Sequence, residues 1–503
     1  MPFHHLPNRR RFLADSTSAA FGLATLRATT VTGLAQEPAA PEPRPSGAPS
    51  LSRQFARWVA GLRYEDLPEA VVDRAKGLTL QNLASALLGS QMPAGRQAIE
   101  FVLEEEAAGV RNGATVLVSG AKVTRGGAAF ANSEMMLAGG KWDTFRMLTH
   151  PGTAVIPAAL IAAESGSASG RDFITGVVAG YEVMERMAAD WIPTVMARGF
   201  HAGPVFSIFG AAIAAAKIMR FDGDQLHTVI SLCTNLAGSN LESRALREGA
   251  AVRNAMLAVA LAKRGPIPGG EAVLEGRAGF YHAYAGNNAG DLSYSFVDER
   301  HTDLARLTAA LGSTWLFLET LYRIYSIPGY NIAHIDVTAQ LCAEHDIRYQ
   351  EIDRIEAVVN WLETQYPSPA FPTVREDTGG DPGRGSTRFY SAYGAVKRGF
   401  PLLRGTPDPP EVLELASRVT IIPSHRMTLF GPRVTVFTKD GRSFTRQATG
   451  REFMWDFDEE VRRIQGVAPG LPIPAAQFER LIATCRTLDR DEAATLADLT
   501  VRR

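Results

Sequence analysis

Apolar residues recur every three to four positions along much of residues 51–318, which is the period of an α-helix. One such apolar face consists of Phe173, Val177, Tyr181, Met184 and Met187. Residues 205–219 are expected to form a helix because they follow Pro204, and proline is favoured in a first helical turn. Residues 254–264 predict another helix, which ends at Gly265-Pro266. The pattern therefore predicts a helical domain over residues 51–318.

After about residue 319 the pattern becomes that of strands. Residues 355–362 and 419–422 are rich in β-branched side chains, which pack well on a pleated sheet. Residues 433–446 alternate around Asp440-Gly441, a pair typical of a type I′ hairpin turn, in which both central residues have positive φ. We therefore expect an α/β domain over residues 319–450.

The last segment, residues 451–503, returns to the helical period. Its apolar face consists of Phe478, Leu481, Ile482, Cys485 and Leu488. Inside the α/β domain, the Gly-rich residues 378–386 predict a mobile loop. We expect a mainly α protein of two domains, in which a large all-helical domain is interrupted by a smaller α/β domain and completed by C-terminal helices.

The N-terminus has the features of an export signal. The residues NRRRFL at positions 8–13 resemble a twin-arginine signal, and an Ala/Thr-rich apolar stretch and the small-residue exit Gly33-Leu34-Ala35 follow. We predict a signal peptide over residues 1–35, a Pro-rich linker over residues 36–50, and recognition by the twin-arginine export machinery. The protein would then be periplasmic or secreted. The alternative is a basic tail on a cytoplasmic protein.

Composition excludes several kinds of partner. The 503 residues carry 52 basic and 53 acidic side chains, so no overall field attracts nucleic acid or anionic lipid. The three cysteines, far apart, provide neither a disulfide framework nor a CxxC metal motif. Residues 205–219 are too short for a membrane span and contain Lys217, so we expect no stable membrane anchor. We find no phosphate-binding glycine motif, and we expect neither metal nor nucleotide cofactor.

Two histidines stand where helices are predicted to begin. His150 precedes Pro151-Gly152, and His201 precedes Ala202-Gly203-Pro204. A helix N-terminus favours an anion, and imidazole can move protons near neutral pH. The pair is thus a candidate site for a carboxylate substrate. The alternative is that each histidine only caps or packs against its helix.

A set of arginines is the second candidate feature. Arg244, Arg247, Arg253 and Arg264 lie in one segment, and Arg323 lies where the pattern changes. Guanidinium groups bind carboxylates through paired hydrogen bonds, so the set can hold a polycarboxylate. The face of an exposed helix would look the same.

Several motifs in order carry a family resemblance. They are residues 132–152, Gly180-Tyr181-Glu182, Arg198-Gly199-Phe200-His201, residues 249–265 and Leu274-Glu275-Gly276. Together they resemble the MmgE/PrpD family, over most of residues 51–400. The resemblance implies a helical domain with an α/β lid, a homodimer, and action on small polycarboxylates without metal or organic cofactor. The family's reactions share proton abstraction next to a carboxylate, followed by loss of water or carbon dioxide or by reprotonation.

The resemblance also implies site residues. The implied catalytic residues are Asp143, Thr144, His150, His201 and Tyr393, and the implied or candidate substrate-binding residues are Arg244, Arg247, Arg323 and His334. Four positions depart from the family pattern: Gly140 replaces a catalytic aspartate, Leu137 replaces a histidine, and Arg244 and Arg323 replace lysines.

These departures alter the expected chemistry. Lysine can serve as an acid or base when it is buried, whereas arginine, with a pKa above about 12, binds carboxylate but does not release its proton. Three interpretations remain open from the sequence. The first is a dehydratase or decarboxylase of a di- or tricarboxylate, the second is an isomerase or epimerase of a small carboxylate, and the third is a carboxylate-binding relative without turnover.

Overall fold

The computed structural model describes residues 47–107, 109–243, 246–325, 327–373, 385–400 and 408–502, which all belong to one compact unit. The predicted signal peptide, most of the Pro-rich linker, Arg244 and residues 378–384 of the predicted mobile loop lie outside the described residues. The predictions of export and of loop mobility therefore stay predictions.

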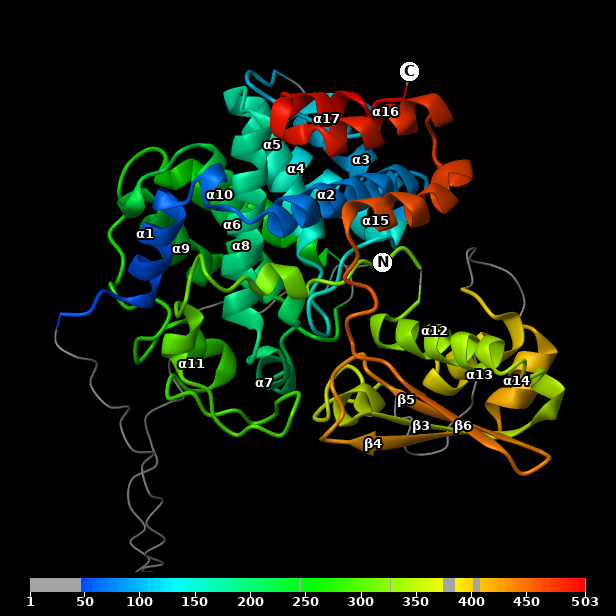
Figure 1. The fold of residues 1–503 in the computed structure, drawn as a ribbon. Helices are drawn as coiled ribbons and strands as arrows, with labels where there is room; N and C mark the ends of the chain where they lie inside the picture. The colour runs from blue at the N-terminus through cyan, green and yellow to red at the C-terminus, as the bar shows by residue number, and fades with distance from the viewer. Residues whose placement is uncertain are drawn as a thin grey trace, which may run out of the picture. The chain divides into compact units, whose positions relative to one another are not determined.

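Helices dominate the first part of the described chain, as the spacing predicts (Figure 1). They are α1 (Leu51–Gly61), α2 (Glu69–Gly89), α3 (Pro93–Glu106), α4 (Arg125–Gly139), α5 (Gly152–Gly166), α6 (Gly170–Ala188), α7 (Ile192–Ala197), α8 (Ala202–Ile218), α9 (Gly223–Leu236), α10 (Arg247–Ala262) and α11 (Phe280–Ala285). Two short strands, β1 (Ala114–Thr115) and β2 (Lys122–Val123), pair antiparallel. Helix α10 begins earlier than predicted because its first two turns carry charged and small residues that hide the apolar period.

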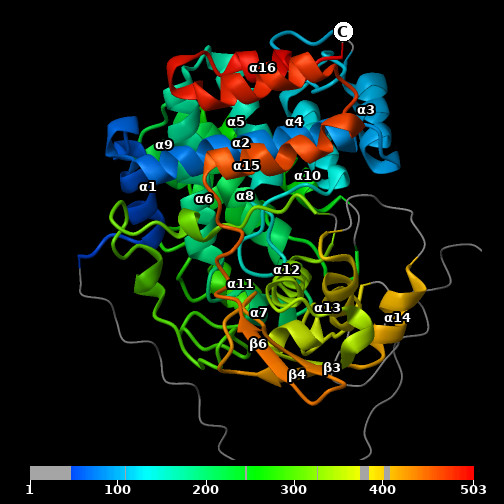
Figure 2. The ribbon, with the colours of Figure 1, turned by 45° about the vertical axis from the view of Figure 1, so that its right-hand side comes forward.

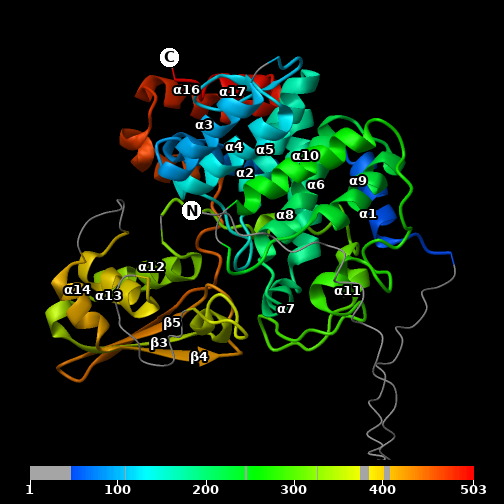
Figure 3. The same ribbon diagram turned by 180° about the vertical axis from the view of Figure 1, so that it is seen from behind.

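Helix α8 forms the centre of this helical part. All its residues except Lys217 are buried, and α5, α6, α9 and α10 contact it, as Figure 3 shows from behind. Small residues allow helices α6 and α8 to approach closely. A Cβ atom added at Gly180 in α6 would lie only 2.5 Å from the backbone oxygen of Gly210 in α8. This packing places the first turn of α8, which follows His201, next to the first turn of α10.

The α/β part contains one mixed sheet in the order β4-β3-β5-β6. Its elements are α12 (Gly329–Glu344), β3 (Ile352–Asn360), α13 (Thr387–Lys397), α14 (Pro410–Ala416), β4 (Val419–Ser424), β5 (Arg433–Thr438) and β6 (Ser443–Gln447). Strands β3 and β4 are parallel, and the other pairs are antiparallel. Helices α12 and α13 cover one face of the sheet (Figure 1). The mainly α fold with an α/β part is thus confirmed.

The hairpin between β5 and β6 is confirmed, but its predicted turn type is wrong. Only Gly441 of the central pair has a positive φ, 88°. The Asp440 carboxylate accepts from the Thr438 hydroxyl at 2.5 Å and from the Arg442 backbone N–H at 3.3 Å. The side chain of Asp440 thus stabilises a longer loop, closed by a backbone bond from the Thr438 N–H to the Arg442 carbonyl.

The C-terminal helices return to the helical part, as Figure 2 shows. They are α15 (Phe457–Ile464), α16 (Ala475–Arg486) and α17 (Ala494–Asp498). Helices α15 and α16 contact α2, and α17 contacts α5. In α16 the predicted apolar face is buried, so the helical period was interpreted correctly. The exact domain boundaries stay predictions.

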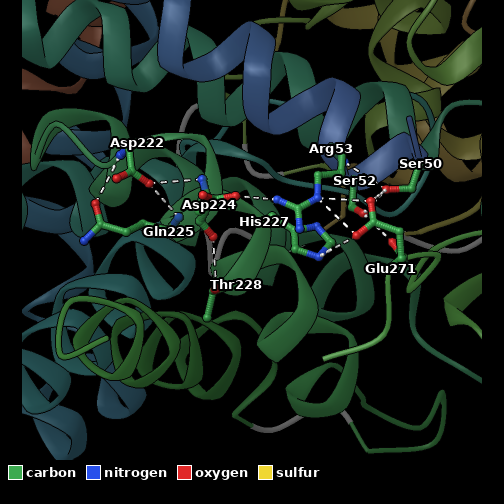
Figure 4. A network of polar contacts seen from close by, with 9 residues as sticks. All are labelled: Ser50, Ser52, Arg53, Asp222, Asp224, Gln225, His227, Thr228 and Glu271. Carbon is green, nitrogen blue, oxygen red and sulfur yellow. Dashed lines mark hydrogen bonds and ion pairs between the residues drawn. The ribbon is translucent and has the colours of Figure 1, made fainter. Parts of the chain in front are cut away.

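A polar network holds the start of α1 against α9 (Figure 4). Arg53 donates to Asp224 at 2.5 Å and to both carboxylate oxygens of Glu271, at 3.0 and 3.1 Å. Ser50 caps α1 and donates to Glu271 at 3.0 Å. The buried His227 of α9 lies at the edge of this network, with Nε2 3.9 Å from Glu271.

The described residues were searched for membrane-spanning helices, disulfide bonds and metal-binding groups. Across those residues no helix has both the length and the apolar character needed to cross a membrane. Cys233, Cys342 and Cys485 are buried and do not pair with one another. Within the same ranges, no group of three or more His, Cys, Asp or Glu side chains can hold a metal ion.

Candidate active site

A cavity of about 290 Å³ brings several of the predicted site residues together. Its lining consists of Gly140, Trp142, Thr144, Arg146, Met147, Leu148, His150, Arg247, Arg323, Ile327, Pro328, Gly329, Tyr330, Tyr366 and Phe430. Four predicted residues are among them: Thr144, His150, Arg247 and Arg323. None of these described lining residues is acidic, while three are arginines, so the cavity favours an anion.

His150 is held by the loop that precedes α5. Its Nδ1 lies 2.9 Å from the backbone oxygen of Asp143 and 3.4 Å from the Thr144 hydroxyl oxygen. A carbonyl oxygen only accepts hydrogen bonds, so Nδ1 carries the proton and donates it there. In the neutral imidazole, Nε2 is therefore the nitrogen that can accept a proton from a substrate.

Trp142 connects His150 to Arg323. The indole and imidazole rings are stacked, with centroids 4.5 Å apart and planes 8° apart, and the Arg323 guanidinium carbon lies 4.8 Å from the indole centroid. Arg323 also donates to the Thr144 hydroxyl at 3.3 Å, and its backbone N–H donates to Gln81 at 3.0 Å. These contacts fix the orientation of both the imidazole and the guanidinium.

The surroundings of His150 hold the pKa of its imidazole well below its usual value. Burial is the largest cause, and the positive charge of Arg323 and then of Arg247 adds to it, while the bond to the Asp143 carbonyl opposes it. His150 is thus neutral at neutral pH. A bound carboxylate would offset the arginine charges and raise the pKa of His150, which makes the imidazole a stronger base when substrate is present.

Asp143, predicted to be catalytic, lies behind the cavity rather than in its lining. It is fully buried and accepts the Gly152 N–H at 3.0 Å and the Tyr181 hydroxyl at 2.6 Å. Burial raises the pKa of this carboxyl to about 6, against the opposing effect of these hydrogen bonds. Asp143 stabilises the first turn of α5, next to His150, and does not line the cavity, so its predicted catalytic role stays a prediction.

His201, also predicted to be catalytic, contacts the cavity residue Arg247 but is not itself in the lining. It caps α8: Nδ1 lies 3.2 Å from the Gly203 N–H nitrogen, and Nε2 lies 2.9 Å from the Arg247 guanidinium. Both neighbours are donors, and a neutral imidazole has only one accepting nitrogen. The two contacts are therefore not both hydrogen bonds, and the Arg247 guanidinium lies against the His201 ring.

Two further predicted residues do not reach the cavity. His334 is buried in α12, where Nδ1 lies 3.0 Å from the Ser391 hydroxyl, and burial lowers its pKa to about 3. A histidine that stays neutral in the core does not hold a substrate carboxylate. Tyr393 lies in α13, with its ring 6.0 Å from that of Phe389. The α/β part instead contributes Tyr330, Tyr366 and Phe430, for which the sequence contained no local motif.

The sequence also did not indicate a buried carboxylate behind Arg247. Glu248 is fully buried, with one oxygen 3.6 Å from Nε of Arg247 and the other near Gly203 in the first turn of α8. Burial raises the pKa of Glu248, with Arg247 opposing. Glu134, in α4, lies next to Gly249, and burial and then Glu248 raise its pKa to about 7. Two buried carboxyl groups thus lie on the protein side of Arg247, and their raised pKa values favour the protonated form.

Glu134→Gln is expected to flatten part of the dependence of stability on pH. The folded protein keeps on Glu134 a proton that the unfolded chain releases near its ordinary pKa of 4.5. The stability from this proton is fully present below pH 4.5 and is lost as the pH rises through about 7. Glutamine stays neutral, so between about pH 4 and pH 8 the variant should gain roughly 2–3 kcal/mol of unfolding free energy relative to the wild type.

Urea unfolding at several pH values measures this gain. Glu100→Gln changes an exposed residue of the neighbouring helix α3 and is the matched control. Profiles of Glu134→Gln and wild type that run parallel across this range would contradict the expectation.

Comparison with known proteins places the chain in a family. Residues 53–292 match the MmgE/PrpD N-terminal domain, which covers the helical part from α1 to the loop after α11. The chain belongs to the MmgE/PrpD family. The predicted resemblance is thus confirmed, and the cavity of this MmgE/PrpD protein contains the His150 and Thr144 that the resemblance implies.

The similar proteins of known name are decarboxylases or decarboxylase-like. A cis-aconitate decarboxylase-like protein of Aspergillus oryzae is 24% identical over 60% of this chain and 63% of its own length. A cis-aconitate decarboxylase of Aspergillus terreus is 25% identical over 56% of this chain and 57% of its own length. The human cis-aconitate decarboxylase is 26% identical over 53% and 58%. The chain spans about three fifths of the length of these relatives. The predicted homodimer stays a prediction.

Proposed function

We propose that this MmgE/PrpD protein is a lyase that removes a proton next to a carboxylate of a small organic acid and then releases carbon dioxide. The observation that supports this most is the composition of the cavity lining, where the neutral His150 lies with Arg247 and Arg323 and none of the described lining residues is acidic. Arginine binds the substrate carboxylates, and imidazole takes the proton.

In the first step, Nε2 of His150 accepts a proton from the carbon next to a bound carboxylate. The electron pair of the broken C–H bond passes into that carboxylate and forms an enediolate-like intermediate. Arg247 and Arg323 stabilise its negative charge, an effect worth on the order of 3 kcal/mol per donor in comparable sites. The imidazolium returns its proton to another carbon of the chain, which leaves His150 neutral again. The C–C bond to the departing carboxylate then breaks, carbon dioxide leaves, and the electron pair of that bond takes a proton from solvent at the carbon that held the carboxylate, so the reaction consumes one proton overall.

The cavity favours decarboxylation over dehydration. Carbon dioxide leaves as a neutral molecule, whereas a departing hydroxide needs an acid that protonates it. The described lining offers arginines, phenols and one threonine besides His150, and arginine is a poor acid. An epimerase needs two proton-carrying groups at one carbon, and His201, the expected second group, lies behind Arg247. The names of the relatives agree with decarboxylation.

Incubation of the purified protein with cis-aconitate and related polycarboxylates in D₂O, followed by proton NMR, tests this proposal. A decarboxylated product with solvent deuterium at the carbon that lost carbon dioxide is the expected result. Deuterium in recovered substrate without product would instead identify an isomerase. Dehydration of a hydroxy acid would identify a dehydratase, and saturable binding with no reaction would identify a binding protein; each of these three outcomes overturns the proposal.

A further inference from the structure

We propose that ionised Glu248 is the counterion that positions Arg247 in the free protein. A substrate carboxylate bound to Arg247 replaces this counterion, and Glu248 then takes up a proton from solvent. Glu248 is thereby a positioning residue of the candidate active site. The inference rests on the carboxylate binding of the proposed function and goes beyond it, because it assigns to binding itself the uptake of a proton.

Arg247 lies between the cavity and two groups that do not line it. Its Nε lies 3.6 Å from a carboxylate oxygen of Glu248, and a terminal nitrogen of its guanidinium lies 2.9 Å from Nε2 of His201. Arg247 lines the cavity, whereas Glu248 and His201 are not in the lining. A carboxylate in the cavity and the carboxylate of Glu248 would therefore share one guanidinium.

The carboxylate of Glu248 depends on Arg247 for its stability as an ion. Its side chain is fully buried, and neither of its oxygens accepts a hydrogen bond from another described residue. The oxygen Oε1 faces the first turn of α8, since a Cβ atom at Gly203 would lie 2.5 Å from it. A buried carboxylate with so few polar contacts is stable as an ion only while a cation lies next to it.

The helices packed against the start of α10 offer no second permanent cation to Glu248. Helix α4 contributes Glu134, another buried carboxyl, whose Oε1 has no hydrogen-bond partner among the described residues. His201 precedes α8, and the neutral His150 precedes α5. Residues 228–236 of α9 include no acidic residue, basic residue or histidine. Ionised Glu248 therefore has Arg247 as its permanent positive neighbour from these elements.

A bound carboxylate makes ionised Glu248 more costly. The new anion shares the Arg247 guanidinium, and its negative charge disfavours a second carboxylate nearby. Burial already raises the pKa of Glu248, and Arg247 is the main opposing influence, so a shared arginine allows the pKa to rise further. A buffer acid then releases a proton, and an O–H bond forms on Glu248. Because binding takes up this proton, Kd should rise by up to about tenfold per pH unit wherever Glu248 is ionised in the free protein.

Calorimetric titration with tricarballylate tests this coupling. This saturated tricarboxylate lacks the double bond of cis-aconitate, so binding is measured without turnover. Titrations in HEPES and in Tris, which have different ionisation enthalpies, give the number of protons taken up per bound ligand. Between about pH 7 and pH 9 we expect a maximum of about one proton in the wild type. Glu248→Gln should take up none, and its Kd should change less than about twofold over the same range, because glutamine does not ionise.

Two further variants make the assignment specific. Glu106→Gln is the matched control: it removes the carboxylate that pairs with Arg253 of the same helix, α10, at 2.6 Å, outside the cavity lining, and proton uptake should stay unchanged. His150→Gln removes the other group whose charge a bound carboxylate would affect, and it should also keep the uptake. Uptake that survives in Glu248→Gln, or that disappears in His150→Gln, overturns the inference. The proton count refers to bound ligand, so a loss of folded protein does not alter it.

This titration and the decarboxylation test have distinguishable outcomes. Tricarballylate that binds with proton uptake dependent on Glu248, while cis-aconitate is not decarboxylated, supports the inference and overturns the proposed function. Decarboxylation of cis-aconitate without proton uptake on tricarballylate binding overturns the inference and leaves the proposed function intact. Failure of tricarballylate to bind at millimolar concentration also overturns the inference.

Discussion

His150→Gln is expected to lower kcat for decarboxylation by roughly 10²- to 10⁴-fold, the usual contribution of a positioned acid–base group. Nδ1 of His150 donates to the Asp143 carbonyl, so Nε2 is the nitrogen that takes the substrate proton. Glutamine can keep a hydrogen bond to that carbonyl and has a similar size, but it cannot accept and return a proton. Substrate affinity should change less than threefold, because Arg247 and Arg323 remain.

Steady-state kinetics and calorimetric binding measure the two effects separately. His227→Gln is the matched control, because His227 is also a buried histidine but lies near the network of Arg53 and Glu271, away from the cavity lining. Its kcat should equal that of the wild type. A His150→Gln enzyme that keeps more than about a tenth of the wild-type kcat would show that another group carries the proton.

Arg247→Gln is expected to raise KM by about 10- to 100-fold, the usual cost of a lost charge-assisted hydrogen bond to a carboxylate. Arg247 lines the cavity, and its guanidinium is 2.9 Å from Nε2 of His201 and 3.6 Å from Glu248. Removal of its charge also leaves Glu248 buried without a cation. The free energy of unfolding should therefore fall by roughly 3 kcal/mol near neutral pH.

A double variant separates binding from folding. Arg247→Gln with Glu248→Gln removes the buried charge and should recover most of the lost stability, while KM stays high because the cavity still lacks the guanidinium. Arg253→Gln is the matched control: it lies on the same helix, α10, but is partly exposed and pairs with Glu106 at 2.6 Å. Recovery of KM in the double variant would show that Arg247 acts on folding rather than on substrate.

Short-range patterns were sufficient for most of the architecture. The apolar periods of α6, α8 and α16 lie in contiguous residues, so they could be read without knowledge of neighbours. The hairpin of β5 and β6 was equally local, yet its turn type was mispredicted because the Asp440 side chain bonds within its own loop. The first residue of a helix was predicted inaccurately where charged residues occupy the first turns, as in α10.

Some residues of the candidate site could likewise be predicted from local sequence, and others could not. Thr144 and His150 were accessible because they lie six residues apart in one loop whose backbone carbonyl holds the imidazole. Tyr393 and His334 lie outside the lining: His334 contacts Ser391 of α13, and the Tyr393 ring lies next to Phe389 of its own helix. Nothing in their own segments indicates this placement. The sequence did not predict that Glu248 is buried next to Arg247, because an acidic residue in the first turn of a helix is commonly explained by the helix dipole alone.

The sequence by itself determined the helical and strand segments, the family, and the His150 loop, because these depend on residues close together in the chain. Only the tertiary structure decided which side chains form the cavity. In the folded protein Asp143 and His201 lie outside the cavity lining, and Glu248 lies next to Arg247. Tyr330, Tyr366 and Phe430 line the same cavity as Trp142. The physical reason is that a cavity is defined by the packing of helices and a sheet far apart in sequence, and burial and charge act across that packing rather than along the chain.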